Sequence, residues 1–368
     1  MNATALSPRR LLMTADSVGG VWTYAMELCR VFSGRGIGVL LATMGDALSS
    51  EQRAQATSLP HVELAESEFK LEWMPNAWDD VDAAGHWLLE LERRFRPDVI
   101  HLNSYAHGAY PFLAPKLVVA HSYVLSWWRA VKSEEAPPSW AHYAQRVREG
   151  LSQANLVVAP TASMLESVRR HYGPLSHAQV IHHGRDGGKF KSAAKGPFIF
   201  SAGRLWDEAK NLGVLSEIAP QLPWPVMVAG PRVRDGVGEF SSTNVAMLGE
   251  LAESHLATFF ARAAIGVFPA RYEPFGLAVL EAALSECALV LGDIPSLREL
   301  WQGAAWFVPP DDAPALRHAI LELVQDSARC AALGSRARQR ALTMNPPAMG
   351  EAYLQAYSEL MEKQAVVA

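Results

Sequence analysis

The sequence has little that would suit a secreted or membrane-spanning protein. Its three cysteines, Cys29, Cys287 and Cys330, are far apart and odd in number. They fit neither a disulfide framework nor a metal knuckle, so we expect a reducing, cytoplasmic environment. No apolar run is long enough to cross a bilayer, and the N-terminal MNATALSPRR lacks the apolar core of a signal peptide. Peripheral binding to a membrane stays open.

An excess of positive charge is also missing. The 38 Asp and Glu residues outnumber the 33 Lys and Arg residues, which gives a formal net charge of −5. The basic residues are scattered along the chain, so we expect no general attraction to nucleic acid. The glycine-rich loop SVGGVW (17–22) is not a G-x-G-x-x-G fingerprint, which disfavours a nicotinamide cofactor.

What the sequence does contain is a regular alternation of short apolar runs and amphipathic helical stretches, typical of α/β domains with parallel sheets. A stretch rich in Gly and Lys, GRDGGKFKSAAKG (184–196), interrupts it and is predicted to be an interdomain linker. We therefore expect a first domain in residues 1–185, a second in 197–345 and a helix in 346–368. The predicted strands lie at 11–15, 39–43, 98–102, 117–121, 156–159, 180–182, 198–202, 226–229, 265–268 and 288–291.

Polar residues and glycines follow several predicted strands of the first domain. Gly19 and Gly20 stand between a strand and a helix predicted from Tyr24 to Arg35, where a backbone can approach an anion closely. His121 ends another strand and could act on a hydroxyl or brace a sugar. Taken alone, an ordinary tight turn and a strand-end histidine without chemistry explain these features equally well or better. His101 and Asn103 carry a weaker version of the same argument.

The second domain has a cationic pair after its first predicted strand. Arg204 follows Gly203, and Lys210 comes six residues later. A planar guanidinium and a point charge together suit a diphosphate. A solvated pair of surface charges is the alternative.

The segment EPFGLAVLEAAL is the most informative one. We expect a helix to begin at Pro274, which would leave the amides of Phe275, Gly276 and Leu277 to bind a phosphate. Glu281 lies five residues beyond Gly276, about 7–8 Å at the helical rise, a suitable distance for a nucleotide ribose. A glutamate on such an apolar helix needs a partner if it is buried, which favours a ligand.

Two other acidic and aromatic features need separate treatment. Asp79, Asp80 and Asp82 look like a metal motif, but they begin an amphipathic helix, so we interpret them as helix-start acids. Seven of the eleven tryptophans precede residue 150. Aromatic rings stack on sugars, although packing explains most single tryptophans.

Together, EPFGLAVLEAAL, the Gly-Gly loop, the strand that ends in His121 and the GRL…KN sequence around Arg204 and Lys210 resemble family 4 of the glycosyltransferases over nearly the whole chain. The resemblance implies the GT-B fold, two Rossmann-like domains with parallel sheets facing across a cleft, and a C-terminal helix packed back on the first domain. It assigns Glu281 to the nucleotide ribose, Glu273 to the donor sugar, Arg204 and Lys210 to the diphosphate, and His121 to a place beside the reacting carbon.

The resemblance further implies a retaining, metal-independent transfer from a nucleotide-sugar, with UDP as the expected nucleotide and no cofactor. The donor-binding residues would be Gly19, Gly20, Arg204, Lys210, Phe275, Gly276, Leu277 and Glu281. The acceptor is unidentified: a saccharide, a small metabolite or a lipid-linked molecule. The acceptor-side candidates are Trp22, Trp127, Trp128, His101 and Asn103.

The sequence departs from the family pattern in two places. His183-Gly184 replaces an Asn-Gly turn, and GDIPSLRE replaces a Gly-Gly-x-x-Glu pattern, with Glu299 shifted. Two other functions stay open. One is a nucleotide-sugar epimerase of the same fold, and the other is a non-catalytic nucleotide-sugar-binding protein.

Overall fold

The computed structural model describes residues 7–234 and 238–367, so the first six residues of the N-terminal stretch lie outside it. The chain divides into two compact units. Unit 1 comprises the residues up to Ser126, Glu135–Gly184 and the segment from Pro346 onward, and unit 2 comprises Trp127–Glu134 and Arg185–Asn345. The predicted linker therefore belongs to unit 2 from Arg185 on.

Unit 1 is built on a seven-stranded parallel sheet in the order β3-β2-β1-β4-β5-β6-β7. The strand order reverses between β1 and β4, and ligands of such open sheets bind outside the carboxyl ends of the strands at this switch point. The strands are Arg10–Asp16 (β1), Gly38–Met44 (β2), Val62–Glu66 (β3), Val99–Leu102 (β4), Lys116–Val119 (β5), Leu156–Ala159 (β6) and Ala178–Val180 (β7).

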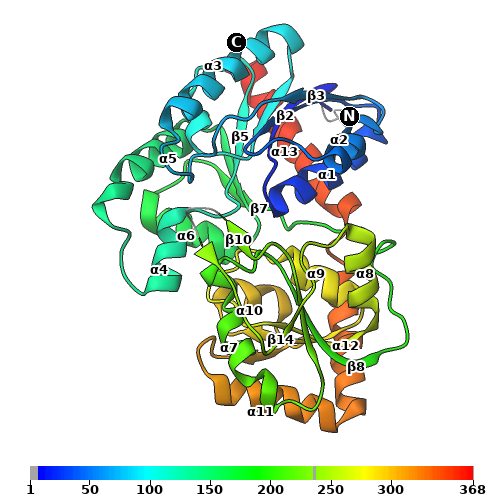
Figure 1. Ribbon diagram of the computed structural model, residues 1–368. Coiled ribbons are helices and arrows are strands. Elements are labelled where there is room, and N and C mark those ends of the chain that lie inside the picture. Colours follow the sequence, from blue (N-terminus) through cyan, green and yellow to red (C-terminus); the bar gives the residue numbers. More distant parts are fainter. Residues whose placement is uncertain (1–6, 235–237, 368) are drawn as a thin grey trace. The chain divides into compact units, whose positions relative to one another are not determined.

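Helices alternate with these strands along the chain (Figure 1). They are Gly20–Ser33 (α1), Ser50–Thr57 (α2), Trp78–Phe95 (α3), Ala141–Gln153 (α5), Ala162–Tyr172 (α6) and Pro346–Val367 (α13), with short 3-10 turns at Ala106–Ala109 (η1) and Pro138–Trp140 (η2). One further helix, Val124–Lys132 (α4), spans the division between the units. Asp79 and Asp80 lie in the first turn of α3, where acidic side chains complement the helix dipole.

Unit 2 repeats the design with a six-stranded parallel sheet in the order β12-β9-β8-β13-β14-β15. Its strand order reverses between β8 and β13, so the second switch point lies beyond the ends of these two strands. The strands are Gly196–Ala202 (β8), Val226–Ala229 (β9), Ala246–Met247 (β12), Ala263–Phe268 (β13), Ala288–Gly292 (β14) and Trp306–Val308 (β15), beside a small antiparallel pair, Val233–Arg234 (β10) and Gly238–Glu239 (β11).

The helices of unit 2 also alternate with its strands. They are Leu212–Ile218 (α7), Glu253–Arg262 (α8), Leu277–Leu284 (α9), Pro295–Trp301 (α10), Ala313–Gln325 (α11) and Ser327–Ala341 (α12), with 3-10 turns at Glu208–Lys210 (η3) and Ala219–Gln221 (η4). The prediction of two Rossmann-like α/β domains with parallel sheets is confirmed.

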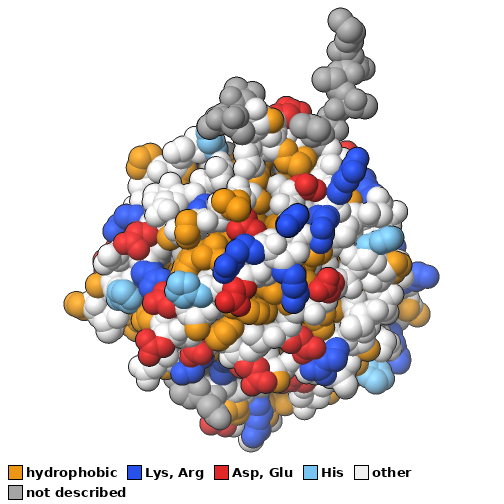
Figure 2. Space-filling model, turned by 90° about the horizontal axis from the view of Figure 1, so that it is seen from above, with side chains coloured by type: hydrophobic (Ala, Val, Ile, Leu, Met, Phe, Trp, Pro, Cys, Tyr) orange, Lys and Arg blue, Asp and Glu red, His pale blue; other side chains and the backbone are white. Residues whose placement is uncertain are grey.

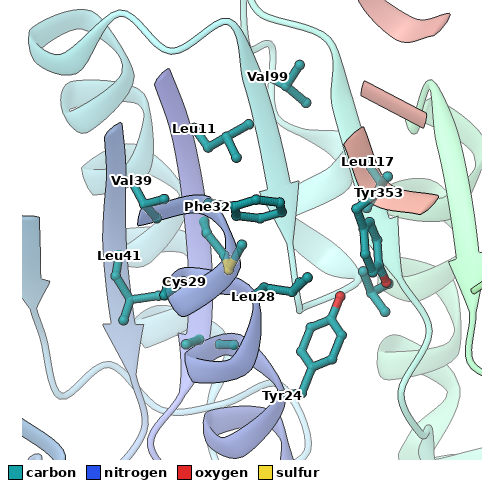
Figure 3. Packing of buried hydrophobic residues seen from close by; sticks show 14 of the residues in the cluster. Leu11, Tyr24, Leu28, Cys29, Phe32, Val39, Leu41, Val99, Leu117 and Tyr353 are labelled. Atoms are coloured by element: carbon teal, nitrogen blue, oxygen red, sulfur yellow. The ribbon is translucent and has the colours of Figure 1, made fainter. Parts of the chain in front are cut away.

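The helix α13 completes the hydrophobic core of unit 1, although it comes last in the chain. Tyr353 and Tyr357 of α13 are fully buried in the same cluster as Phe32 and Leu28 of α1 (Figure 3). Tyr357 also hydrogen-bonds His101 of β4 at 2.6 Å. The expectation that the C-terminal helix packs on the first domain is met within unit 1.

Surface charges are mixed on the face drawn in Figure 2. Several Lys and Arg side chains gather near the middle of that face, with Asp and Glu side chains around them. Over residues 7–234 and 238–367, none of the helices combines the length and the apolar character needed to cross a bilayer.

Candidate functional site

The switch point of unit 1 begins with the Gly-Gly loop after β1. Gly19 has φ +80°, which favours glycine, and α1 begins at Gly20. The start predicted from the sequence, Tyr24, is four residues too late. The prediction excluded Gly20 because glycine is unfavourable in helices. The helix amides at the start of α1 therefore follow the β1 strand directly, as an anion site requires.

Trp22 lies in this first turn of α1, and its side chain faces inward. It is 6% exposed, and its indole Nε1 donates to Oε1 of Gln55 in α2 at 3.1 Å. These contacts favour the packing interpretation of Trp22. Its role on the acceptor side stays a prediction.

His121 and Asn103, which the sequence singled out separately, meet at the carboxyl edge of the unit 1 sheet. The Asn103 amide nitrogen donates to the Thr14 carbonyl oxygen at 2.5 Å, which turns its oxygen Oδ1 towards His121. Nε2 of His121 lies 2.7 Å from that oxygen. Because an amide oxygen only accepts, Nε2 of His121 must carry the proton.

The other ring nitrogen of His121 is also engaged. Nδ1 of His121 lies 3.3 Å from Nε2 of His183, which must donate because Nδ1 holds the lone pair. Burial lowers the pKa of His121 to about 3, so the ring is neutral at physiological pH. With both nitrogens hydrogen-bonded to protein groups, the neutral ring is poorly suited to act as a base.

His101 is a buried structural neighbour of this pair. Its Nε2 lies 3.1 Å from the hydroxyl of Tyr24, and its Nδ1 lies 2.6 Å from the hydroxyl of Tyr357. Burial, together with nearby His121, lowers the pKa of His101 to about 3. His101 is fully buried, which favours a role in holding α1, β4 and α13 together.

The switch point of unit 2 gathers the predicted cations. Arg204 follows β8, and its Nη2 lies 2.9 Å from Oδ2 of Asp207. Burial opposes ionisation of Asp207, but Arg204 and Lys210 together hold its pKa below the ordinary value. Gly230, at the end of β9, permits this loop because a Cβ there would lie 1.8 Å from the Gly203 carbonyl oxygen.

Lys210 and Glu273 come together from the ends of the two strands that flank this switch point. Nζ of Lys210 lies 2.5 Å from Oε2 of Glu273, and both side chains are mostly buried. The hydroxyl of Ser296, within the departing segment GDIPSLRE, donates to the Glu273 carbonyl at 2.6 Å. Ser296, in the segment that differs from the family pattern, thus stabilises the backbone of Glu273.

The helix that follows Glu273 starts later than the sequence indicated. α9 begins at Leu277 with Gly276 as its N-cap at φ +88°, so the prediction that Pro274 occupies the first helical position is wrong. The left-handed conformation of Gly276 delays the first turn. The amides without an intrahelical acceptor are those of the first turn, beginning at Leu277 rather than Phe275.

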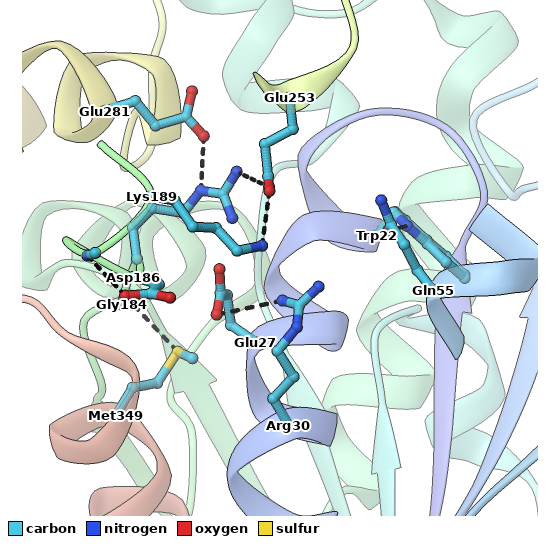
Figure 4. A network of polar contacts seen from close by, with 12 residues as sticks. Trp22, Glu27, Arg30, Gln55, Gly184, Asp186, Lys189, Glu253, Glu281 and Met349 are labelled. Atoms are coloured by element: carbon cyan, nitrogen blue, oxygen red, sulfur yellow. Dashed lines mark hydrogen bonds and ion pairs between the residues drawn. The ribbon is translucent and has the colours of Figure 1, made fainter. Parts of the chain in front are cut away.

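Glu281 has a partner that the sequence did not reveal. The carboxylate is 5% exposed, and its Oε1 lies 2.7 Å from Nε of Arg185 (Figure 4). The expectation that a buried Glu281 needs a partner is met by Arg185, which supplies the compensating charge, and the assignment of Glu281 to a ligand stays a prediction. A short glycine-rich stretch gives no periodicity from which a buried arginine could be recognised.

The two neighbouring tryptophans of α4 have different surroundings within unit 2. Nε1 of Trp127 donates to Oδ1 of Asp207 at 2.9 Å, and Nε1 of Trp128 donates to Oε1 of Glu134 at 3.3 Å. Trp127 thus belongs to the same group as Arg204 and Asp207. Whether either ring contacts an acceptor stays a prediction.

The described part of the chain, 7–234 and 238–367, brings together no group of three or more His, Cys, Asp and Glu residues that could hold a metal ion. Metal independence of the reaction remains a prediction, because a metal ion could also arrive bound to a substrate rather than to protein side chains.

Comparison with known proteins identifies the class of protein. Residues 18–187 match the family model described as Glycosyltransferase Family 4, and residues 196–326 match the model described as Glycosyl transferases group 1. Together the two matches identify a glycosyltransferase of the family 4 and group 1 type. Glycogen synthases from two strains of Mycobacterium tuberculosis are 28% identical to this chain over 280 residues. The match covers 68% of this chain and 66% of each glycogen synthase, so the chain spans just under two thirds of the length of these relatives.

Solved structures share the fold of this chain. Sucrose-phosphate synthase from Thermosynechococcus elongatus superposes with a TM-score of 0.80 at 18% identity, covering 96% of this chain and all of that one. HepE from Anabaena, in complex with UDP-glucose, gives 0.76 at 15% identity, covering 95% and 99%. At these identities the likeness establishes the GT-B fold.

Proposed function

We propose that this chain is a retaining glycosyltransferase that transfers a sugar from a nucleotide-sugar, with UDP as the expected nucleotide, to an acceptor hydroxyl without a metal ion. The similarity to two glycosyltransferase family models supports the reaction class. The observation that carries the proposal is the convergence of Lys210, Glu273 and the start of α9 at the switch point of unit 2.

The chemistry of this group fits a diphosphate and the sugar beside it. The first-turn amides of α9 and the Lys210 ammonium would bind the phosphates and neutralise the leaving group, as a metal ion does in other enzymes. Lys210 forms an ion pair with Glu273. A diphosphate would compete for the ammonium, and Glu273 would then turn to hydroxyls of the donor sugar.

Glu281 is proposed to accept hydrogen bonds from the ribose diol, as the family resemblance implies. His121 is proposed to brace the transferred sugar through its neutral ring rather than to remove a proton. The leaving phosphate would then take the proton of the acceptor hydroxyl, and the sugar would keep its anomeric configuration.

A thermal-shift screen of UDP-glucose, UDP-GlcNAc, ADP-glucose and GDP-mannose tests donor binding. A ligand at 100 times its dissociation constant adds about 2.7 kcal/mol to the free energy of unfolding. The shift should be lost in Glu281→Gln and kept in Glu217→Gln, which alters an exposed glutamate of the same unit. An unchanged shift in Glu281→Gln would refute the donor assignment.

Turnover of the selected donor tests the reaction. NMR of the sugar released by slow hydrolysis, or transferred to an acceptor, should show the donor's anomeric configuration, and chelation with EDTA should leave the rate unchanged. An inverted product would overturn retention. Incubation with UDP-GlcNAc alone distinguishes an epimerase, which would change the donor without any acceptor.

A further inference from the structure

Arg185 occupies an unusual place in unit 2. Its side chain is 4% exposed and lies between two carboxylates, with Nε 2.7 Å from Oε1 of Glu281 and Nη2 2.6 Å from Oε2 of Glu253 (Figure 4). Nζ of Lys189 lies 2.6 Å from the other oxygen of Glu253. Two cations and two anions therefore form one network that includes Glu281.

The backbone and the ring of a neighbour hold the guanidinium in place. The Arg185 amide donates to the Met344 carbonyl at 3.1 Å, and the guanidinium carbon lies 4.9 Å from the centre of the Phe190 ring, which is fully buried. An arginine fixed in this way presents its planar fork in one orientation. The Glu281 carboxylate that it contacts is fixed as well.

Because Glu281 is buried, its contact with Arg185 determines whether the carboxylate can stay charged. A carboxylate that is nearly removed from water takes up a proton unless a cation compensates it, and a protonated carboxyl loses half of its capacity to accept hydrogen bonds. Lys189 cannot substitute, because its ammonium contacts Glu253 and not Glu281. Arg185 thus compensates the charge of Glu281 and orients its carboxylate.

We infer that Arg185 is a positioning residue of the donor site, which keeps Glu281 ionised and oriented so that the site selects a ribose over a 2′-deoxyribose. This inference rests on the proposed function, because it assumes that Glu281 binds the ribose diol. Arg185 acts through Glu281 and need not touch the nucleotide. Neither residue type nor spacing in the glycine-rich stretch assigns it such a role.

Isothermal titration with UDP and 2′-deoxy-UDP tests the inference, or with the diphosphate that the donor screen selects and its 2′-deoxy analogue. A hydrogen bond to a charged group corresponds to roughly a tenfold to hundredfold preference, so the wild-type protein should bind UDP at least tenfold more tightly than the deoxy analogue. In Arg185→Met this ratio should fall towards one. Lys189→Met, the matched control in the same network, should keep the wild-type ratio.

A double-mutant cycle separates positioning from direct contact. If Arg185 acts only through Glu281, adding Arg185→Met to Glu281→Gln should change the affinity for UDP by less than twofold. Equal and additive losses would overturn the inference, because Arg185 would then contact the nucleotide itself. Wild-type selectivity in Arg185→Met would overturn it too.

Two further measurements guard against trivial outcomes. Thermal unfolding without ligand reports whether each variant folds. Arg185→Lys keeps the charge but lacks the planar fork of the guanidinium, so it should give an intermediate ratio, which serves as the test if Arg185→Met is unstable. Wild-type selectivity in Arg185→Lys would overturn the inference. If Glu281→Gln itself keeps UDP affinity and selectivity, the proposed function fails. If only Arg185 variants keep them, the inference alone fails.

Discussion

Unit 1 should lose stability in mild acid because its buried histidines cannot be protonated in place. Burial lowers the pKa of His101 and of His121 to about 3, that of His107 to about 4, and that of His183 well below its ordinary value. In the unfolded chain each takes up a proton near pH 6.5. The stabilisation is therefore present above about pH 6.5 and is lost as the pH falls towards 4.

The magnitude follows from proton linkage. Lowering the pH from 7 to 5 costs ~2 kcal/mol for each of the three histidines with a stated value. Glu72 opposes this loss, because burial raises its pKa to about 7 despite hydrogen bonds from the Ala106 and Tyr105 amides. As the pH falls, Glu72 takes up a proton in the folded state before it does so in the unfolded state. This adds ~2 kcal/mol to the free energy of unfolding over the same interval. The net loss of about 4 kcal/mol is a large part of a typical domain stability.

Hydrogen exchange read by mass spectrometry at pH 7 and pH 5, corrected for intrinsic exchange rates, measures this loss unit by unit. Peptides of β4 and β5 should lose protection free energy, and peptides of β13 and β14 should lose much less. His107→Gln should reduce the loss by ~2 kcal/mol, because glutamine takes up no proton in the unfolded chain. The glutamine amide can still donate to the Val81 carbonyl, to which His107 Nε2 lies at 3.0 Å. His255→Gln, at an exposed position of unit 2, is the control. Equal losses in both units, or none in unit 1, would refute the reasoning.

Three further predictions concern packing and burial. Gly150→Ala should lower the free energy of unfolding by ~3 kcal/mol in denaturant titrations, because a Cβ there would lie 1.8 Å from the Tyr105 carbonyl oxygen. An unchanged free energy of unfolding would mean that the backbone segments around Gly150 and Tyr105 can move apart without cost. Tyr357→Phe should cost about 2 kcal/mol, measured in the same way, because it removes the hydroxyl bonded to buried His101. Cys29, whose pKa burial raises to about 12, should react with Ellman's reagent only after unfolding, and rapid native labelling would contradict its burial.

Central strands were predictable from the sequence, whereas most edge strands were not; the edge strand β7 was predicted at 180–182 and lies at Ala178–Val180. β6 and β9 match their predicted limits because a buried parallel strand is apolar on both faces. The edge strands β3 and β15 were missed. β3 reads VELAE and is partly exposed along its length, so it carries neither a continuous apolar run nor a clean alternation. The same reasoning applies to the very short β10, β11 and β12.

For the candidate site, the sequence identified residue types but not their partners. Lys210 and Glu273 were both singled out, yet their contact joins positions 63 residues apart. Arg185 and Glu281 are 96 residues apart and meet only because the chain enters unit 2 beside α9. Such pairings depend on the tertiary arrangement, and no local periodicity encodes them.

The contribution of α13 to unit 1 has a consequence for how the protein is made. Unit 2 is complete once Asn345 has left the ribosome, whereas unit 1 still lacks the helix that carries Tyr353 and Tyr357. Domains usually fold in the order of their synthesis. Here the N-terminal unit must wait with part of its core uncovered until α13 has been synthesised, so unit 2 is free to reach its native state first.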